Sequence, residues 1–171
     1  MRRIVLTVMA LLGLTAGVQA QDIDFGITAG YLNARGSIKS DGVTISADES
    51  GIYGGLVAEF SVGNKVGLQP ELLYASIDGS DGILLPVLFE FGIAPKLNLQ
   101  AGPQFVFSLE DVPEDFTGVE FDLAGGIGLD ITEAFFAEAR YTFQLNNSYT
   151  GPEDVKVRGN YLSVGIGYKF F

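Results

Sequence analysis

Apolar side chains recur at every second position through most of this chain, and this alternation limits its fold more than any other feature. In the segment 135–144, the apolar series alternates with a polar series: Glu138, Arg140, Thr142 and Gln144. Successive side chains of a β-strand point to opposite faces, so the pattern predicts a strand with one apolar and one polar face. Eight such segments occur, at residues 22–31, 52–60, 66–74, 85–91, 96–107, 119–130, 135–144 and 161–170. Most have about the ten residues that a tilted strand needs to cross a bilayer.

The connections between these segments are alternately short and long. The short connections are residues 62–64, 93–95 and 131–133, and the long polar ones are 35–50, 76–82, 110–118 and 146–159. Short turns at one end and long loops at the other are typical of outer-membrane barrels, with the short turns in the periplasm. An even number of strands then places both termini on the periplasmic side.

The short turns also predict a register between neighbouring strands. A three-residue turn in each place sets apolar residues opposite one another: Phe60 with Val66, Phe91 with Leu97, and Leu129 with Phe135. A two-residue turn would move one apolar set to the other face, which is disfavoured wherever one face must be apolar.

These patterns predict an all-β fold, an eight-stranded antiparallel up-and-down transmembrane β-barrel. The alternative is a soluble, lipocalin-like barrel whose apolar residues face inward around a ligand. The polar series favours the membrane barrel, because it carries few charges and many glycines and therefore suits the narrow interior of eight strands. Aromatic residues near the strand ends would form the interfacial girdles: Tyr31, Tyr74, Phe107, Phe121 and Phe143 at one rim, and Phe60, Phe91, Phe135 and Phe170 at the other.

Three prolines oppose this interpretation. Pro70, Pro86 and Pro103 lie inside predicted strands, where proline removes a ladder hydrogen bond. We expect β-bulges to accommodate them.

The polar face predicts an interior charge network. Its members are Glu59, Glu71, Glu90, Lys96, Asp122, Glu138 and Arg140. With the register above, Asp122 would lie opposite Thr142 and diagonal to Arg140, within reach of an ion pair. A proton or cation relay, or a gate, is one interpretation. An ion-pair plug is the favoured one, because an unpaired carboxylate in a dry interior is costly.

The first twenty residues have the features of a secretory signal peptide. Basic residues at positions 2 and 3 precede an apolar run, and small residues end at Ala20. This predicts cleavage after Ala20, leaving residues 21–171 as the barrel domain. A membrane anchor is the alternative, but the run is shorter than the roughly 20 residues of a spanning helix.

The composition argues against several other functions. The net charge of −11, without a basic stripe, argues against nucleic acid as a partner. The chain has no histidine, the usual general base of barrel hydrolases, so we expect no enzyme activity and no catalytic residue. We expect no cofactor. The outer loops are acidic, and Asp78 and Asp81 are weak candidates for a divalent cation that bridges to lipopolysaccharide phosphates.

Several short motifs together resemble the outer membrane protein β-barrel domain family, which is common in Bacteroidota. The motifs are Gly54-Gly55-Leu56-Val57, Leu68-Gln69-Pro70-Glu71-Leu72-Leu73-Tyr74, Leu85-Pro86-Val87-Leu88, Gly102-Pro103-Gln104 and Gly165-Ile166-Gly167-Tyr168-Lys169-Phe170. The resemblance implies an outer-membrane location and includes the three strand prolines. It also implies that the insertion machinery binds a terminal outward aromatic residue, for which this chain offers Phe170 or Phe171.

The expected function is structural or adhesive, with the extracellular loops as the interaction surface for an unidentified partner. The surrounding partners would be outer-membrane lipid and lipopolysaccharide. A narrow, porin-like channel for ions or small solutes is a second hypothesis, and a soluble periplasmic binder of an apolar ligand is a third. Few eight-stranded barrels have room for an open pore, because side chains fill the interior.

Overall fold

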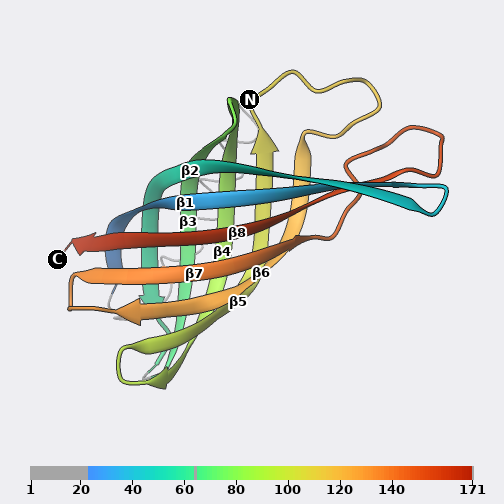
Figure 1. The fold of residues 1–171 in the computed structure, drawn as a ribbon. Coiled ribbons are helices and arrows are strands. Elements are labelled where there is room, and N and C mark those ends of the chain that lie inside the picture. Colours follow the sequence, from blue (N-terminus) through green and yellow to red (C-terminus); the bar gives the residue numbers. More distant parts are fainter. Residues whose placement is uncertain (1–22, 64, 171) are drawn as a thin grey trace.

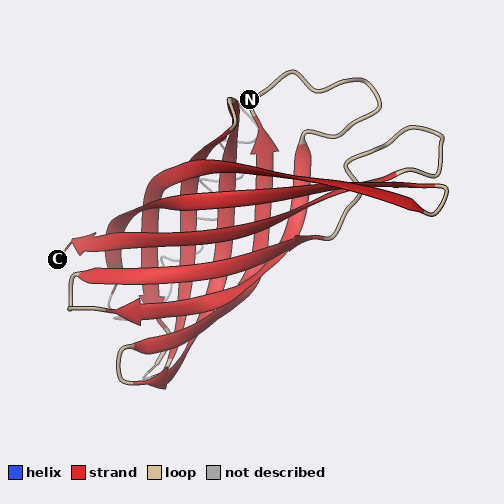
Figure 2. Ribbon diagram, in the orientation of Figure 1, coloured by secondary structure: helices blue, strands red, loops and turns tan. Residues whose placement is uncertain are grey.

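The chain folds into a closed barrel of eight antiparallel strands (Figures 1 and 2). The computed structural model describes residues 23–63 and 65–170; the predicted signal peptide and Phe171 lie outside them. The strands are β1 Ile23–Ser40, β2 Val43–Ser61, β3 Val66–Ile77, β4 Ser80–Ala94, β5 Leu97–Ser108, β6 Val119–Asp130, β7 Phe135–Gln144 and β8 Lys156–Phe170. Each strand pairs with its sequence neighbours, and β1 pairs with β8 to close the barrel. None of the described residues forms a helix long and apolar enough to span a bilayer.

The polar face of each strand points inward and the apolar face points outward. Gln69, Glu138 and Arg140 are each at most 4 % exposed, whereas Leu56 and Ile166 are 58 % and 66 % exposed. An apolar outer surface of this kind requires lipid around it. The predicted fold is confirmed, and the apolar residues do not enclose a lipocalin-like cavity.

Aromatic pairs lie on the outer surface near both ends of the barrel. Phe105 packs against Phe121 towards the end of the long loops, with ring centroids 5.2 Å apart. Phe135 packs against Tyr168 at the end of the short turns, at 5.0 Å. Such rings suit the two membrane interfaces, where an amphipathic or aromatic side chain contacts both headgroups and acyl chains.

The predicted registers are wrong by two residues, although they keep the correct faces together. The observed partners are Leu68 for Phe60, Leu99 for Phe91 and Ala137 for Leu129. Between β6 and β7, the amide of Ile131 donates to the carbonyl of Phe135 at 2.8 Å, so residues 132–134 form the turn. The hydroxyl of Thr132 accepts the amide of Phe135 at 2.9 Å and stabilises that position of the turn.

The turn between β4 and β5 has two residues, Pro95 and Lys96. The sequence predicts a three-residue turn here, because a two-residue turn by itself would place the apolar residues of the two strands on opposite faces. Ala94 pairs with Leu97 across it, and a register shift between Gly92 and Ala94 follows at once. That irregularity adds one residue to β4 and returns the apolar side chains to the outer face. The apolar side chains of β4 and β5 therefore share one face, as expected, but a bulge in β4 rather than the length of the turn puts them there.

Two of the four predicted outer loops are tight hairpins instead. β1 and β2 continue to the turn at Asp41 and Gly42, and β3 and β4 meet at Asp78 and Gly79. All four residues have positive φ, between 47° and 85°. Asp-Gly is the dipeptide that favours this turn in a hairpin, because both central residues must be left-handed. The predicted long connections 110–118 and 146–159 remain largely irregular, apart from the first residues of β8.

The three strand prolines interrupt the ladder without bulges. Pairing lapses beside Pro70 between β2 and β3, beside Pro86 between β3 and β4, and beside Pro103 between β4 and β5. The register is the same on both sides of each gap, so the expected bulges are absent from these described pairs. The barrel thus tolerates each proline as a local loss of strand pairing.

Gly79→Ala should destabilise the β3–β4 hairpin by about 1–2 kcal/mol, because an L-residue in the left-handed region is strained. Gly79 has φ of 85°, and a Cβ there would meet nothing within 4 Å, so strain alone is tested. Urea unfolding in lipid vesicles measures the effect. Gly36→Ala is the matched control, because Gly36 also has open space around it and carries no positive φ. Equal stabilities of the two variants would contradict the prediction.

Candidate functional site

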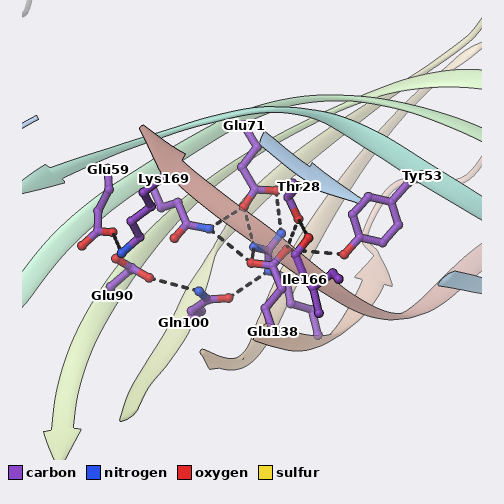
Figure 3. Close-up of polar contacts among 11 residues, drawn as sticks. Thr28, Tyr53, Glu59, Glu71, Glu90, Gln100, Glu138, Ile166 and Lys169 are labelled. Carbon is purple, nitrogen blue, oxygen red and sulfur yellow. Dashed lines mark hydrogen bonds and ion pairs between the residues drawn. The ribbon is translucent and has the colours of Figure 1, made fainter. Parts of the chain in front are cut away.

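A buried polar cluster, here called the central cluster, crosses the middle of the lumen (Figure 3). Arg140 from β7 donates from Nη1 to Oε2 of Glu71 at 2.7 Å, and its Nη2 contacts Glu71 and Glu138. Its Nε donates to Oε1 of Gln100 at 2.9 Å. The two-pronged contact with Glu71 uses the planar fork that makes arginine suited to carboxylates. One cation thus joins strands β3, β5 and β7.

Hydroxyl and amide groups surround the two carboxylates of the central cluster. Thr28 and Tyr53 donate to Oε1 of Glu138 at 3.3 and 3.4 Å. Gln100 donates onward to Oε1 of Glu90 at 3.0 Å. Because Glu71 and Glu138 are at most 5 % exposed, these donors replace the water that the carboxylates lose on burial. The arrangement therefore pairs each buried charge with an opposite charge or with hydrogen-bond donors.

Glycines on neighbouring strands make room for the large inward side chains. A Cβ at Gly126, opposite Arg140, would lie 2.8 Å from the Cγ of that arginine. A Cβ at Gly167 would lie 2.0 Å from the ring of Phe136. Glycines interrupt the polar series in the sequence, and the absence of a side chain at Gly126 and Gly167 leaves the space that Arg140 and Phe136 occupy.

A second ionic group lies nearer the periplasmic turns. The ammonium of Lys169 on β8 is 2.5 Å from Glu59 and 3.3 Å from Asp130. Glu59 and Glu90 were both predicted to be interior, but Lys169 was not singled out, although its inward position follows from the same alternation. Lys96, which was predicted to be interior, is exposed in the β4–β5 turn and donates to the carbonyl of Ile131 at 3.0 Å. The turn comprises residues 95–96 rather than the expected 93–95, so it ends one residue later and leaves Lys96 outside the lumen.

Asp122 does not meet Arg140 as predicted. It pairs with Gln144, and Gly126 lies opposite Arg140, because the true register is shifted by two residues. Asp122 is 0 % exposed and accepts a hydrogen bond from Gln104 at 3.1 Å. Its Oδ1 has no hydrogen-bond partner among the described residues.

An apolar layer closes the lumen above the central cluster. Leu32, Tyr53, Leu73, Ala75 and Leu84 are buried against one another there. The interior was predicted to be polar, and this layer was missed. The signal was present in the sequence, because Tyr53 and Leu73 occupy inward positions in their segments.

The extracellular end carries a three-stranded sheet that extends beyond the rest of the barrel, here called the extension. Arg35–Ser40 of β1 pairs with Val43–Asp48 of β2 on one side, and β8 from Lys156 pairs on the other. Figure 1 shows these strands running past the ends of β3 to β7. On the outer side of β1 and β2, Arg35 is 3.4 Å from Asp48.

The two candidate cation ligands lie at the tip of the β3–β4 hairpin. Asp78 is a turn residue with φ of 47°, and Asp81 lies three residues on, with its amide donating to Glu110 at 3.2 Å. Among the described residues, no group of three or more acidic side chains is close enough to hold a metal ion. The Asp-Gly turn accounts for the local sequence that suggested a cation loop.

Comparison with known families settles the class of this barrel. The outer membrane protein beta-barrel domain matches residues 5–170. The chain belongs to this family. Membership confirms the resemblance found in the sequence, and places the barrel of this outer membrane protein in the bacterial outer membrane.

Solved structures of outer membrane proteins resemble this chain at low sequence identity. Ail, the attachment invasion locus protein of Yersinia pestis, is 17 % identical over 86 % of this chain and 98 % of that chain, with a TM-score of 0.50. OprG of Pseudomonas aeruginosa is 17 % identical over 88 % and 97 %, with a TM-score of 0.45. No curated protein sequence matches the chain. The likeness to Ail concerns the fold alone.

Proposed function

We propose that this outer-membrane barrel is non-catalytic, does not conduct through its lumen, and binds a protein partner through its extracellular extension. The observation that carries the proposal is the open edge of β2. This refines the structural or adhesive function expected from the sequence, because it names strands rather than loops as the contact surface.

The two edges of the extension differ. On the β8 edge, the amide of Ser148 donates to the carbonyl of Val157, and Asn147 accepts the amide of Val157 at 2.7 Å. On the β2 edge, pairing with β3 begins only at Gly51, so within the described chain no strand pairs with Val43–Ser50 on that side. An unpaired strand edge is a template for an extended segment of another protein.

The inward-facing side of the extension is apolar. Ile38 lies directly opposite Ile45, and these two side chains and Val43 are 52 %, 69 % and 63 % exposed. The other side carries Thr44 and the Arg35–Asp48 pair. A partner strand that pairs with β2 would place alternate side chains against this apolar surface, which adds burial to the backbone hydrogen bonds.

Ile45→Lys should reduce attachment of cells that display the barrel to protein-coated surfaces by about tenfold, because burying an unpaired charge costs more than the ~1.4 kcal/mol that this factor represents. The assay counts attached cells of a heterologous Gram-negative host. Thr44→Lys is the matched control, because it adds the same charge to the same strand on the other face. Heat-modifiable gel mobility of outer-membrane fractions checks that both variants fold. Equal attachment of the two variants, or no attachment by the wild type, would contradict the proposal.

The lumen supports the non-conducting part of the proposal. The central cluster and the apolar layer occupy successive levels of the tube, so an ion would have to displace Arg140 or the packed side chains around Leu32. Current recordings of the purified barrel in planar bilayers should show no single-channel steps above the baseline current. Stable single-channel currents would favour the narrow channel instead.

The proposal includes how the chain reaches its place. Residues 1–20 act as a cleaved signal peptide, the outward aromatic residue at the end of β8 is bound by the insertion machinery, and lipopolysaccharide surrounds the barrel. The charge network acts as a structural plug. The apolar run that precedes Ala20 and the outward, 47 % exposed Phe170 support this route.

A further inference from the structure

The extracellular mouth of the barrel holds a cavity, here called the cup, of about 240 Å³. Its apolar wall is formed largely by Leu32, Leu84 and Val106, which belong to or pack against the apolar layer. Its polar wall includes Glu49 and Glu120. A neighbouring cavity of about 210 Å³ shares Glu49, Glu120 and Tyr161, so the two hollows adjoin at the acidic wall.

No basic side chain of the described residues forms an ion pair with Glu49 or Glu120, the two carboxylates of the acidic wall. Glu120 accepts a hydrogen bond at Oε2 from the hydroxyl of Tyr161 at 2.5 Å, and no other donor of the described residues bonds to its carboxylate. One inward position deeper on β6 lies Asp122, wholly buried and with Oδ1 unpartnered among the described residues. Two carboxylates on one strand face, with nothing positive between them, favour binding of a cation.

The basic side chains inside the described barrel are engaged elsewhere. Arg140 bonds to Glu71 and Glu138, and Lys169 bonds to Glu59 and Asp130. Arg35 and Arg158 border the neighbouring cavity, but both are exposed, and Arg35 lies beside Asp48 on the outer side of the extension. The charge that the acidic wall lacks is therefore one that a ligand can supply.

We propose that the cup binds a small organic ammonium ion, with the ammonium group at Glu120 and an apolar chain or ring against Leu32, Leu84 and Val106. A metal ion fits less well, because hard cations take six or more oxygen ligands and much of this cavity is apolar. The volume is below the roughly 300–1,000 Å³ of sites for drug-sized molecules, which indicates a ligand with a single short apolar group. The cup shares Glu49 with the β2 edge, but the ligand contacts proposed for it lie on other strands, at Glu120, Leu32, Leu84 and Val106. The cup can therefore bind its ligand whether or not the extension binds a protein.

The test is calorimetric titration of the whole barrel in phospholipid nanodiscs, with empty nanodiscs as the blank. Three probes separate the parts of the proposal: benzylammonium has both groups, benzyl alcohol has the ring without the charge, and methylammonium has the charge without the ring. Benzylammonium should bind at least about tenfold more tightly than either of the others, since a charge-assisted hydrogen bond contributes about 1.5–3 kcal/mol. If benzyl alcohol bound as tightly as benzylammonium, the cup would be an apolar cavity that does not recognise the charge. If methylammonium bound as tightly as benzylammonium, binding would be non-specific attraction of a counter-ion. Either result overturns the proposal.

Glu120→Gln should weaken benzylammonium binding at least about tenfold, because the amide keeps an acceptor for Tyr161 but loses the negative charge. Glu153→Gln is the matched control, because it removes the same charge from the exposed β7–β8 loop. Equal weakening by both variants would overturn the site. Amide chemical shifts of the wild-type barrel give a result that needs no variant. Benzylammonium should perturb Leu84, Val106 and Glu120, and changes spread over the acidic loops instead would also overturn the proposal.

Discussion

Arg140→Met is expected to lower the free energy of unfolding by about 3–5 kcal/mol, the cost of leaving buried charges without their partner. Glu71 and Glu138 both contact this guanidinium, and both carboxylates are at most 5 % exposed. Methionine fills part of the same space, so the loss reports charge more than volume. Urea unfolding in lipid vesicles, followed by heat-modifiable gel mobility, measures the change.

Two further variants identify the cause of that loss. Arg158→Met removes an exposed arginine from the extension and should change stability by no more than about 0.5 kcal/mol. The triple variant Arg140→Met, Glu71→Gln, Glu138→Gln removes all three charges and should recover most of the stability. If Arg140→Met and Arg158→Met were equally stable, the central cluster would not hold the barrel together.

Leu56→Arg is expected to destabilise the barrel by about 2–4 kcal/mol, as a charged residue does on the lipid face near the middle of a bilayer. Leu56 lies between Ile27 and Leu72 on neighbouring strands, and all three side chains are 47–58 % exposed on the outer surface. The same unfolding measurement in vesicles gives the change.

Thr44→Arg is the control for the lipid-face prediction. Thr44 lies on the same strand and the same face, twelve residues nearer the tip of the extension. Because that part of β2 lies above the membrane, the same charge there should change stability by no more than about 0.5 kcal/mol. Equal effects at the two positions would mean that lipid does not cover the face that carries Leu56.

Strand identity and strand faces could be predicted from alternation alone. A one-residue slip turns every apolar side chain to the wrong face, so the parity of each pair is strongly determined. A two-residue slip keeps the faces and changes every partner, and alternation does not distinguish the two registers. The hydroxyl of Thr132 and the bulge after Gly92 decide between them locally.

Loop lengths were overestimated where the turn chemistry was missed. Asp41-Gly42 and Asp78-Gly79 are hairpin signals that the sequence displays. Residues 35–50 and 76–82 are polar and lie outside the alternating segments, which predicts long loops only if the left-handed turn propensity of Asp-Gly is ignored. The extension, on which the proposed function rests, therefore could not be predicted from the loop assignment.

The candidate site could be predicted in part. Glu71, Glu138 and Arg140 come from inward positions of their segments, and their contact required only that the barrel be closed and narrow. The role expected for Asp122 depended on register and was wrong in its partner. The inward position of Lys169 follows from alternation alone and does not depend on register, because Lys169 lies between the outward Tyr168 and Phe170.

The sequence by itself determined that this protein is an eight-stranded barrel with lipid outside, because period-two alternation specifies faces and strand length matches a bilayer. Only the tertiary structure decided which inward groups meet, because β1 pairs with β8 across the whole chain and the lumen brings together residues from strands that do not pair. The ion pair between Arg140 and Glu71 spans 69 positions in sequence. The open edge of β2 and the acidic wall of the cup likewise follow from where neighbouring strands end, which no local pattern encodes.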